Sequence, residues 1–370
     1  MILVYGLSII YLLFMVVLLI LGLFVNVKAT TKQLYFLFIL SALSLGFIAY
    51  GTFPNEGSDL SRYYIEIENM RHRGLEYVFN DFLYKNTILT NVFFYLISLT
   101  NNNHLLPFFS TILTFSIFSY VVIKVTKRYN IKISVLSIFI LSFLAIIFLR
   151  PILTGVRQHL ALSIMLLAVF KDFNENKRDF KTILLYILPL LIHTGTIPII
   201  IIRILYLFKG KFYKIRYLLL GWTFLIPFLS IIFLNTNNYL SETFEKLLGY
   251  QYSDYPDMRL FIILILILLL ILYLVKTVSK EKKNLQDFKL EDYTKFYILL
   301  LIFTVGCIDI HHLFSRMLSF CIYMLLPILF LFYKNDRKTK TIVTFLFLFL
   351  IFGLLLYQII DAKTSWRLII

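Results

Sequence analysis

The amino-acid sequence predicts an all-α polytopic membrane protein. Hydrophobic residues make up 60% of the 370-residue chain and charged residues only 15%, whereas a soluble domain is about half apolar and a quarter charged. The mean hydropathy is +0.86, and several apolar runs approach the ~20 residues that cross a bilayer as a helix. We therefore expect one integral membrane domain over residues 1–370, built from about ten transmembrane helices.

Ten apolar segments are predicted to cross the membrane. The first contains no Lys or Arg before Lys28 and is too long for a cleaved signal peptide, so we take it as a true span. Both cysteines, Cys307 and Cys321, fall in apolar segments, which indicates neither a disulfide framework nor a metal site of spaced cysteines. The predicted spans are 2–25, 34–53, 105–123, 133–149, 155–170, 217–234, 259–279, 294–310, 316–333 and 342–360.

The apolar run over 183–208 is predicted to be a re-entrant helical hairpin. Clusters of Lys and Arg precede it (171–181) and follow it (209–216), and such residues in short loops lie on the cytoplasmic side. One long tilted helix is the alternative, but a single crossing would place one cluster outside. Two half-helices that meet near residues 193–195 remove the conflict, and non-helical backbone at membrane depth must face protein or a water-filled cavity. With this topology, the positive-inside rule accounts for the net charge of +16 without nucleic acid.

Two outer loops follow from this topology, over residues 54–104 and 235–258. In the first, we predict an amphipathic helix at the membrane interface over 59–72. Its charged residues recur at spacings of three and four and so share one helical face: Asp59, Arg62 and Glu66. Asp59 can cap this helix as its N-terminal acceptor or act as a general base toward a sugar hydroxyl.

Arg157 is the leading candidate for a site residue. A guanidinium binds phosphate through two hydrogen bonds and stays charged at any working pH, and charge at membrane depth usually marks a site. The alternative is an arginine that reaches toward the interface from a helix end, which fits Arg150 better because Pro151 follows it. Gln158 lies next to Arg157, whereas His159 points to another helix face and has a structural interpretation.

Histidines and a second arginine add to the predicted site. His193 is at the tip of the hairpin and can exchange a proton near neutral pH, although a structural histidine explains it equally. A turn at membrane level holds Asp309, His311 and His312, and Arg316 follows one helical turn later. Adjacent histidines are poor zinc ligands on a helix, so we predict no metal and favour a phosphate-binding role for Arg316. A wet external loop is the alternative.

The order of these motifs resembles a known family. Gly155-x-Arg157-Gln158-x-x-Ala161 opens an apolar helix, a Lys-rich turn follows, and the next apolar run ends in His193-Thr194-Gly195. Asp59-x-x-x-Tyr63-Tyr64 follows the first two predicted spans, and Arg316 opens the span before the last. In these residues the sequence resembles the EpsG family of polysaccharide polymerases, a branch of the Wzy-like proteins. The tail Ser365-Trp366-Arg367 departs from the pattern.

This resemblance implies a membrane glycosyltransferase with a GT-C-like fold. It would polymerise undecaprenyl-diphosphate-linked repeat units of an O-antigen, capsule or exopolysaccharide at the outer face of the bacterial plasma (inner) membrane. No cofactor is expected, because the lipid diphosphate is both anchor and leaving group. A chain-length regulator and a flippase of the same pathway are the implied partners. Asp59 or His193 would be the base, Arg157 would stabilise the leaving group, and diphosphate or sugar would be bound by Arg62, Arg150, Arg157, Gln158, His311, His312 and Arg316.

Three other functions remain open on the sequence. A flippase or transporter for the same lipid would need polar residues toward both faces, whereas here they collect on the predicted outer side. An O-antigen ligase or a polyprenyl-sugar-dependent hexosyltransferase also uses a lipid phosphate donor and an outer site, so the sequence separates these enzymes poorly from a polymerase. A purely structural membrane subunit leaves the arginines and histidines without a role.

Overall fold

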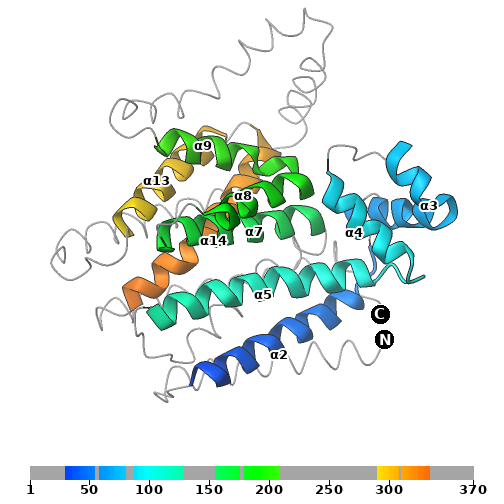
Figure 1. Ribbon diagram of the computed structural model, residues 1–370, viewed down its shortest axis with the longest axis horizontal. Helices are drawn as coiled ribbons and strands as arrows, with labels where there is room; N and C mark the ends of the chain where they lie inside the picture. Colours follow the sequence, from blue (N-terminus) through cyan, green and yellow to red (C-terminus); the bar gives the residue numbers. More distant parts are fainter. Residues whose placement is uncertain are drawn as a thin grey trace, which may run out of the picture. The chain divides into compact units, whose positions relative to one another are not determined.

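The computed structural model describes residues 30–54, 58–80, 87–128, 155–175, 179–207, 290–307 and 310–333. Every regular element in these ranges is a helix (Figure 1), which confirms the all-α prediction for this part of the chain. Other predictions lie outside the described residues: the spans over 2–25, 133–149, 217–234, 259–279 and 342–360, the loop over 235–258, and Arg150.

Helices α2 (Thr31–Tyr50) and α5 (Leu105–Arg128) lie side by side as an antiparallel pair (Figure 1). Thr30 begins α2 as a capping box, in which its hydroxyl accepts from the Gln33 N–H and the Gln33 side chain accepts from the Thr30 N–H. At the other end of α2, the ring of Tyr50 lies 5.6 Å from that of His104, just before α5 begins. The predicted spans over 34–53 and 105–123 are thus both helical.

Small residues let these two helices approach closely. Ala42, Gly46 and Ala49 of α2 are buried, and a Cβ added to Gly46 would lie only 2.6 Å from Cγ1 of Ile112 on α5. Interfaces between membrane helices are enriched in such residues because lipid provides no hydrophobic drive to bring helices together. Close backbone packing therefore supplies the contact between α2 and α5.

Another face of α2 carries large apolar side chains that are well exposed. They recur every three or four residues and are all exposed: Phe36, Ile39, Leu43 and Phe47. A helix that is apolar on all sides is typical of a membrane span. By length and hydropathy, two of the described helices are suited to crossing a bilayer, Thr31–Tyr50 and Leu105–Val125.

Three further predicted spans are also helical. The spans over 155–170 and 294–310 correspond to α7 (Val156–Glu175) and α13 (Leu290–Gly306). The span over 316–333 is part of α14 (His311–Tyr333), which begins earlier than expected. The turn expected over 309–312 is therefore wrong at His311 and His312, which belong to the first turn of this helix. The number of membrane crossings and the GT-C-like class remain predictions.

The run over 183–208 is broken where the sequence predicts. It consists of α8 (Phe180–Ile192), a short 3₁₀ turn (Thr194–Thr196) and α9 (Ile197–Leu207). His193 ends α8 with an extended backbone, and its N–H donates to the Pro189 carbonyl at 2.8 Å. The alternative of one continuous helix is therefore wrong, while the re-entrant path through the membrane remains a prediction.

The predicted amphipathic helix over 59–72 is present as the first part of α3 (Asp59–Asn80). Its ordinary helical path is interrupted at Gly74, where φ is +66°, a conformation that favours glycine. Ser58 caps the start, because its Oγ accepts from the Ser61 N–H at 3.2 Å. The capping role considered for Asp59 thus belongs to Ser58. The next helix, α4, spans Ile88–Ser98.

The described residues form two compact units. The first contains α2 to α5, α7 up to Phe170, and α8 with His193 and Thr194. The second contains the last turn of α7, the chain from Gly195 through α9, α13 and most of α14. In this second unit, the Tyr293 hydroxyl of α13 donates to the Met324 carbonyl of α14 at 3.0 Å and joins these two helices.

Enlarging Gly46 should separate α2 from α5. We expect Gly46→Leu to destabilise the protein by about 1–3 kcal/mol, because overpacking a close contact forces side chains and backbone apart. Thermal unfolding of the detergent-purified protein measures this loss. Leu43→Phe adds bulk on the exposed face of the same helix and should leave the unfolding temperature unchanged. Equal effects of the two substitutions would contradict the close contact.

Candidate functional site

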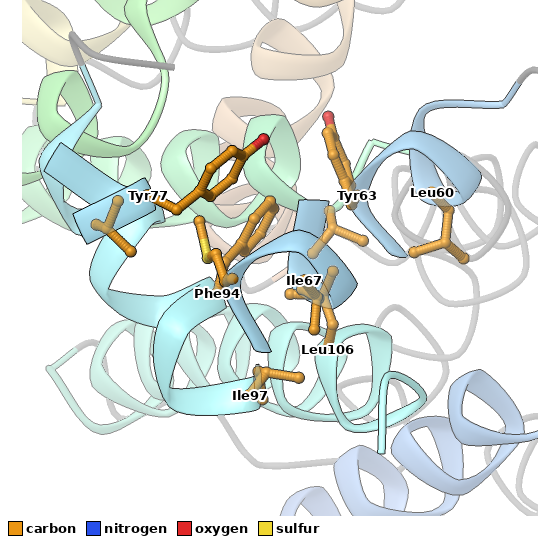
Figure 2. Packing of buried hydrophobic residues seen from close by; sticks show 10 residues of the cluster. Leu60, Tyr63, Ile67, Tyr77, Phe94, Ile97 and Leu106 are labelled. Carbon is orange, nitrogen blue, oxygen red and sulfur yellow. The ribbon is translucent and has the colours of Figure 1, made fainter. Parts of the chain in front are cut away.

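A small apolar core fixes α3 against α4 (Figure 2). Leu60, Tyr63 and Ile67 of α3 contribute one side, and Phe94 and Ile97 of α4 contribute the other. The rings of Tyr63 and Phe94 lie 5.3 Å apart. Tyr63 is only 3% exposed, so its ring is held in one place by packing.

Arg157, in the first turn of α7, stacks on this ring. Its Cζ lies 4.9 Å from the centre of the Tyr63 ring, a distance at which the ring face attracts a cation. The motif Gly155-x-Arg157-Gln158 and the motif Asp59-x-x-x-Tyr63-Tyr64 therefore meet in space. The sequence predicted a site role for Arg157 and used Tyr63 only as part of a motif.

The start of α7 is also held by α5. The Ser110 hydroxyl of α5 donates to the Val156 carbonyl at 3.1 Å, and this bond is buried. His159 is buried as well, which agrees with its expected position on a different face from Arg157. Gln158 and Arg157 are partly exposed. The first turn of α7 thus presents Arg157 from a fixed backbone.

A groove of about 230 Å³ runs beside Arg157. Its walls come from α4, α5, α7 and α8, and only Arg157 and Thr90 contribute polar side chains. The Thr90 hydroxyl already donates to the Ile192 carbonyl at 2.8 Å. Arg157 is therefore the charged group of an apolar groove lined by Leu89, Thr90, Phe93, Leu113, Ile117, Val156, Arg157, Leu160, Ile164 and Ile192.

His193 lies next to this groove along the chain. Its neighbour Ile192 lines the groove and packs against Leu160 and Ala161 of α7. His193 is partly exposed and has the extended backbone that ends α8. The residue before His193 thus packs near the start of α7, while a shared site for His193 and Arg157 remains a prediction.

Asp59 and Arg62 form an ion pair on the exposed face of α3. Asp59 is one helical turn before Tyr63 and so shares its side of the helix. Glu66, which the spacing placed on the same charged face, is instead buried with 5% exposure. Its carboxylate accepts a 2.7 Å hydrogen bond from the Tyr77 hydroxyl. The charged face of α3 therefore ends before Glu66.

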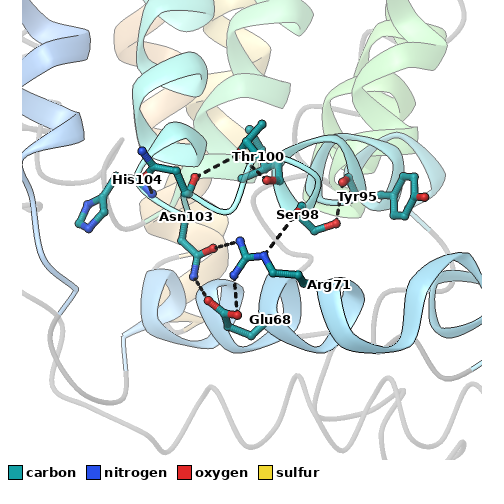
Figure 3. A network of polar contacts seen from close by, with 9 residues as sticks. Glu68, Arg71, Tyr95, Ser98, Thr100, Asn103 and His104 are labelled. Carbon is teal, nitrogen blue, oxygen red and sulfur yellow. Dashed lines mark hydrogen bonds and ion pairs between the residues drawn. The ribbon is translucent and has the colours of Figure 1, made fainter.

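A polar network joins α3 to the start of α5 (Figure 3). The Arg71 guanidinium pairs with Glu68 and donates to the Ser98 carbonyl at 3.1 Å and to Asn103 Oδ1 at 2.8 Å. Asn103 Nδ2 donates in turn to Glu68 Oε1 at 2.8 Å. Hydrogen bonds from Arg71 and Asn103 hold the pKa of the Glu68 carboxyl below its usual value. This network fixes α3, the helix that carries Tyr63.

Sequence reasoning overlooked His104 as well. The rings of Phe53, Tyr50 and Tyr64 surround it at centroid distances of 4.8, 5.6 and 5.7 Å. Burial lowers the pKa of its imidazole and so disfavours the charged form. The signal that could have found it is the run Asn101-Asn102-Asn103, a turn that ends in this aromatic cluster.

The remaining predicted site residues lie on α14. His312 and Arg316 belong to its first two turns and, four residues apart, share one helical face. His312 is exposed and Arg316 is partly exposed. Asp309, like Arg150, lies outside the described residues. That the residues of α14 join Arg157 in one site remains a prediction.

Comparison with known proteins bears on this arrangement. The model of the EpsG family matches residues 34–369, which is most of the chain. The chain belongs to the EpsG family. This confirms the resemblance carried by the motifs around Arg157, His193 and Asp59. A search of curated proteins and a search of solved structures found no match.

Membership of the EpsG family gives a general role. The family consists of Wzy-like proteins of the polysaccharide polymerase type. With its apolar helices, the chain is an integral membrane protein. It has a polymerase-like role in polysaccharide biosynthesis and a glycosyltransferase-like activity in general, on a lipid-linked sugar in a membrane.

The network around Glu68 should weaken in acid. Since the folded-state pKa of Glu68 is lowered, its contribution to stability is present above the ordinary value of about 4.5 and is lost as the pH falls through the lower folded value. The effect is small because Glu68 is partly exposed. Hydrogen exchange of α3 between pH 7 and pH 4 measures it. The exchange rates are corrected for their intrinsic pH dependence. In Glu68→Gln, exchange in α3 should change less between pH 7 and pH 4 than in the parent protein. The same pH response in the variant and the parent would contradict the network.

Replacing the Tyr63 ring should reduce polymer production. Tyr63→Phe keeps the ring face under Arg157 and should retain activity. Tyr63→Leu removes it, and a cation–π contact of about 0.5–2 kcal/mol corresponds to a loss of about two- to thirtyfold. Polymer chain length and amount in cells, normalised to the inserted protein, measure the effect. Equal activity of the two variants would show that the ring face does not hold Arg157.

Proposed function

We propose that this protein polymerises undecaprenyl-diphosphate-linked oligosaccharide repeat units at the outer face of the bacterial plasma membrane. The growing chain would pass from its lipid diphosphate to a hydroxyl of the next lipid-linked unit. The observation that carries this proposal is an apolar groove with one arginine beside it. An isoprenoid chain with an anionic head has the same division into apolar and charged parts.

The size of the groove fits the part of the lipid nearest to the phosphates. A water molecule takes about 30 Å³ in the liquid, and a methylene group is of similar size. A volume of about 230 Å³ therefore holds roughly seven such groups, or one to two isoprene units. The rest of the lipid chain would stay in the bilayer.

Arg157 is suited to the diphosphate. The Cζ atom of Arg157 lies over the Tyr63 ring at 4.9 Å from its centre. Phosphate oxygens would bind the edge of the guanidinium through paired N–H donors. Negative charge grows on the diphosphate as the glycosidic bond to it breaks, so a fixed guanidinium stabilises the transition state more than the ground state.

Two residues remain candidates for the base that activates the acceptor hydroxyl. Asp59 is one turn before Tyr63 on α3, and its carboxylate is paired with Arg62. His193 follows the groove residue Ile192. We assign sugar or diphosphate contacts to Arg62, Gln158, His311, His312, Arg316 and Arg150. A chain-length regulator and a flippase of the same pathway are the proposed partners.

Removing the charge of Arg157 should abolish polymer formation. We expect Arg157→Ala to lose at least about a hundredfold of polymer, because it removes both the phosphate contact and the transition-state charge. Arg157→Lys keeps a point charge without the paired donors and should retain partial activity. Arg73→Ala is the matched control, since Arg73 stacks on Tyr77 at 4.7 Å but does not line the groove. Full-length polymer made by inserted Arg157→Ala protein would refute this assignment.

Glycan analysis of cells that lack the protein separates the proposed function from its rivals. Lipid-linked single repeats at the surface without long chains would identify a polymerase. Loss of single repeats from the outer face would identify a flippase. Full polymer that stays on its lipid would identify a ligase and would move Arg157 to a chain-transfer step.

A further inference from the structure

A buried ion pair joins the last turn of α7 to the last part of α9. Arg203 Nε and Nη2 lie 2.8 Å and 2.6 Å from the same Asp172 oxygen, Oδ2. Each side chain is 7% exposed. The Arg203 guanidinium also lies 4.4 Å from the centre of the Phe173 ring. Such enclosure of a charged pair is costly unless both partners remain, so the contact fixes these two segments together.

The path of the chain between these two residues can be followed from its contacts. Asp179 begins α8 shortly after α7 ends, and its side chain accepts from the Thr182 N–H at 2.8 Å. Ile192, at the far end of α8, packs against Leu160 and Ala161 near the start of α7. Helix α8 therefore runs back along α7 toward its beginning.

Helix α9 brings the chain back toward the end of α7. It follows the break at His193, and its end is tied to the end of α7 by Arg203 and Asp172. Helices of 13 and 11 residues are about 20 and 17 Å long. Each is shorter than the roughly 30 Å hydrocarbon core of a bilayer. A chain that leaves the end of α7 and returns to it by two such helices does not cross.

We propose that the Asp172–Arg203 pair anchors α8 and α9 as a re-entrant hairpin and thereby positions its tip at His193. Arg203 is thus a positioning residue that acts through α9 and touches no substrate. The effect on His193 as a reacting group rests on the proposed function, whereas the path of the chain does not. A salt bridge suits this task because it fixes one register, while apolar contacts between α9 and its neighbours would tolerate sliding.

The first experiment tests the path. In a background with Cys307→Ala and Cys321→Ala, single cysteines replace Phe180 and Leu207, which are 77% and 40% exposed. A membrane-impermeant maleimide is applied to intact spheroplasts and to inside-out vesicles. Labelling of both cysteines from the same side of the membrane is expected for a hairpin. Labelling from opposite sides would overturn the proposal, whatever glycan the protein makes.

The second experiment tests the anchor. Asp172→Arg and Arg203→Asp are compared with the double exchange of both residues, and a cysteine at the exposed Thr194 reports the depth of the tip. We expect each single variant to lose at least about tenfold of polymer and to change the labelling rate at position 194, because a buried charge loses its partner. The double variant should recover much of the polymer production and of the labelling rate at position 194. The pair would not be the anchor if the single variants kept the parent's polymer amount and labelling rate. The same conclusion would follow if the double variant made no more polymer than the single variants.

A conservative variant guards against misfolding. Arg203→Lys keeps the charge and should insert normally, with a labelling rate at position 194 close to that of the parent protein.

The two proposals fail separately in these tests. Active Arg157→Ala protein with a hairpin labelling pattern would refute the proposed site and leave the anchor, whereas inactive Arg157→Ala protein with opposite-side labelling would do the reverse.

Discussion

The stacking of Arg157 on Tyr63 is the contact on which the proposed site depends. It joins α7, which lies among apolar helices, to α3, which has a charged face. Tyr63 can hold a cation there only because Phe94 and the rest of the small core fix its ring. The network of Glu68, Arg71 and Asn103 supports the same helix from its other side. The position of one guanidinium therefore rests on packing, hydrogen bonds and charge pairs spread over several helices.

The sequence predicted those features that are encoded locally. Apolar runs gave α2, α5 and α7, and the clusters of positive charge on both sides of 183–208 indicated a break that the structure shows at His193. Spacing alone placed Asp59 and Arg62 together. Each of these depends on residues within a few turns of one another or on the charge of the nearest loops, which a single sequence contains.

Features that depend on distant partners were not predictable in this way. Glu66 is buried because Tyr77 meets it across the break at Gly74, and spacing along one straight helix could not show this. Arg71 donates to Asn103 in the loop between α4 and α5, and Thr90 donates to the Ile192 carbonyl more than a hundred residues later. The same limit applies to Asp172 and Arg203, which appear in the sequence as two unrelated charges at the ends of apolar runs.

Arg157 and Arg203 have different surroundings, and these distinguish an arginine suited to binding a ligand from one with a structural role. Arg203 meets a carboxylate within a buried aromatic cluster, so its charge is balanced in place and its position is what matters. Arg157 instead meets a ring face at the side of an apolar groove, so an anion brought to the groove would lie beside Arg157. Because the groove is too small for a whole polyprenyl chain, recognition would concentrate on the phosphates and the first isoprene units. Selection of the sugar would then rest on residues outside the groove, such as Asp59 and Arg62 on the exposed face of α3.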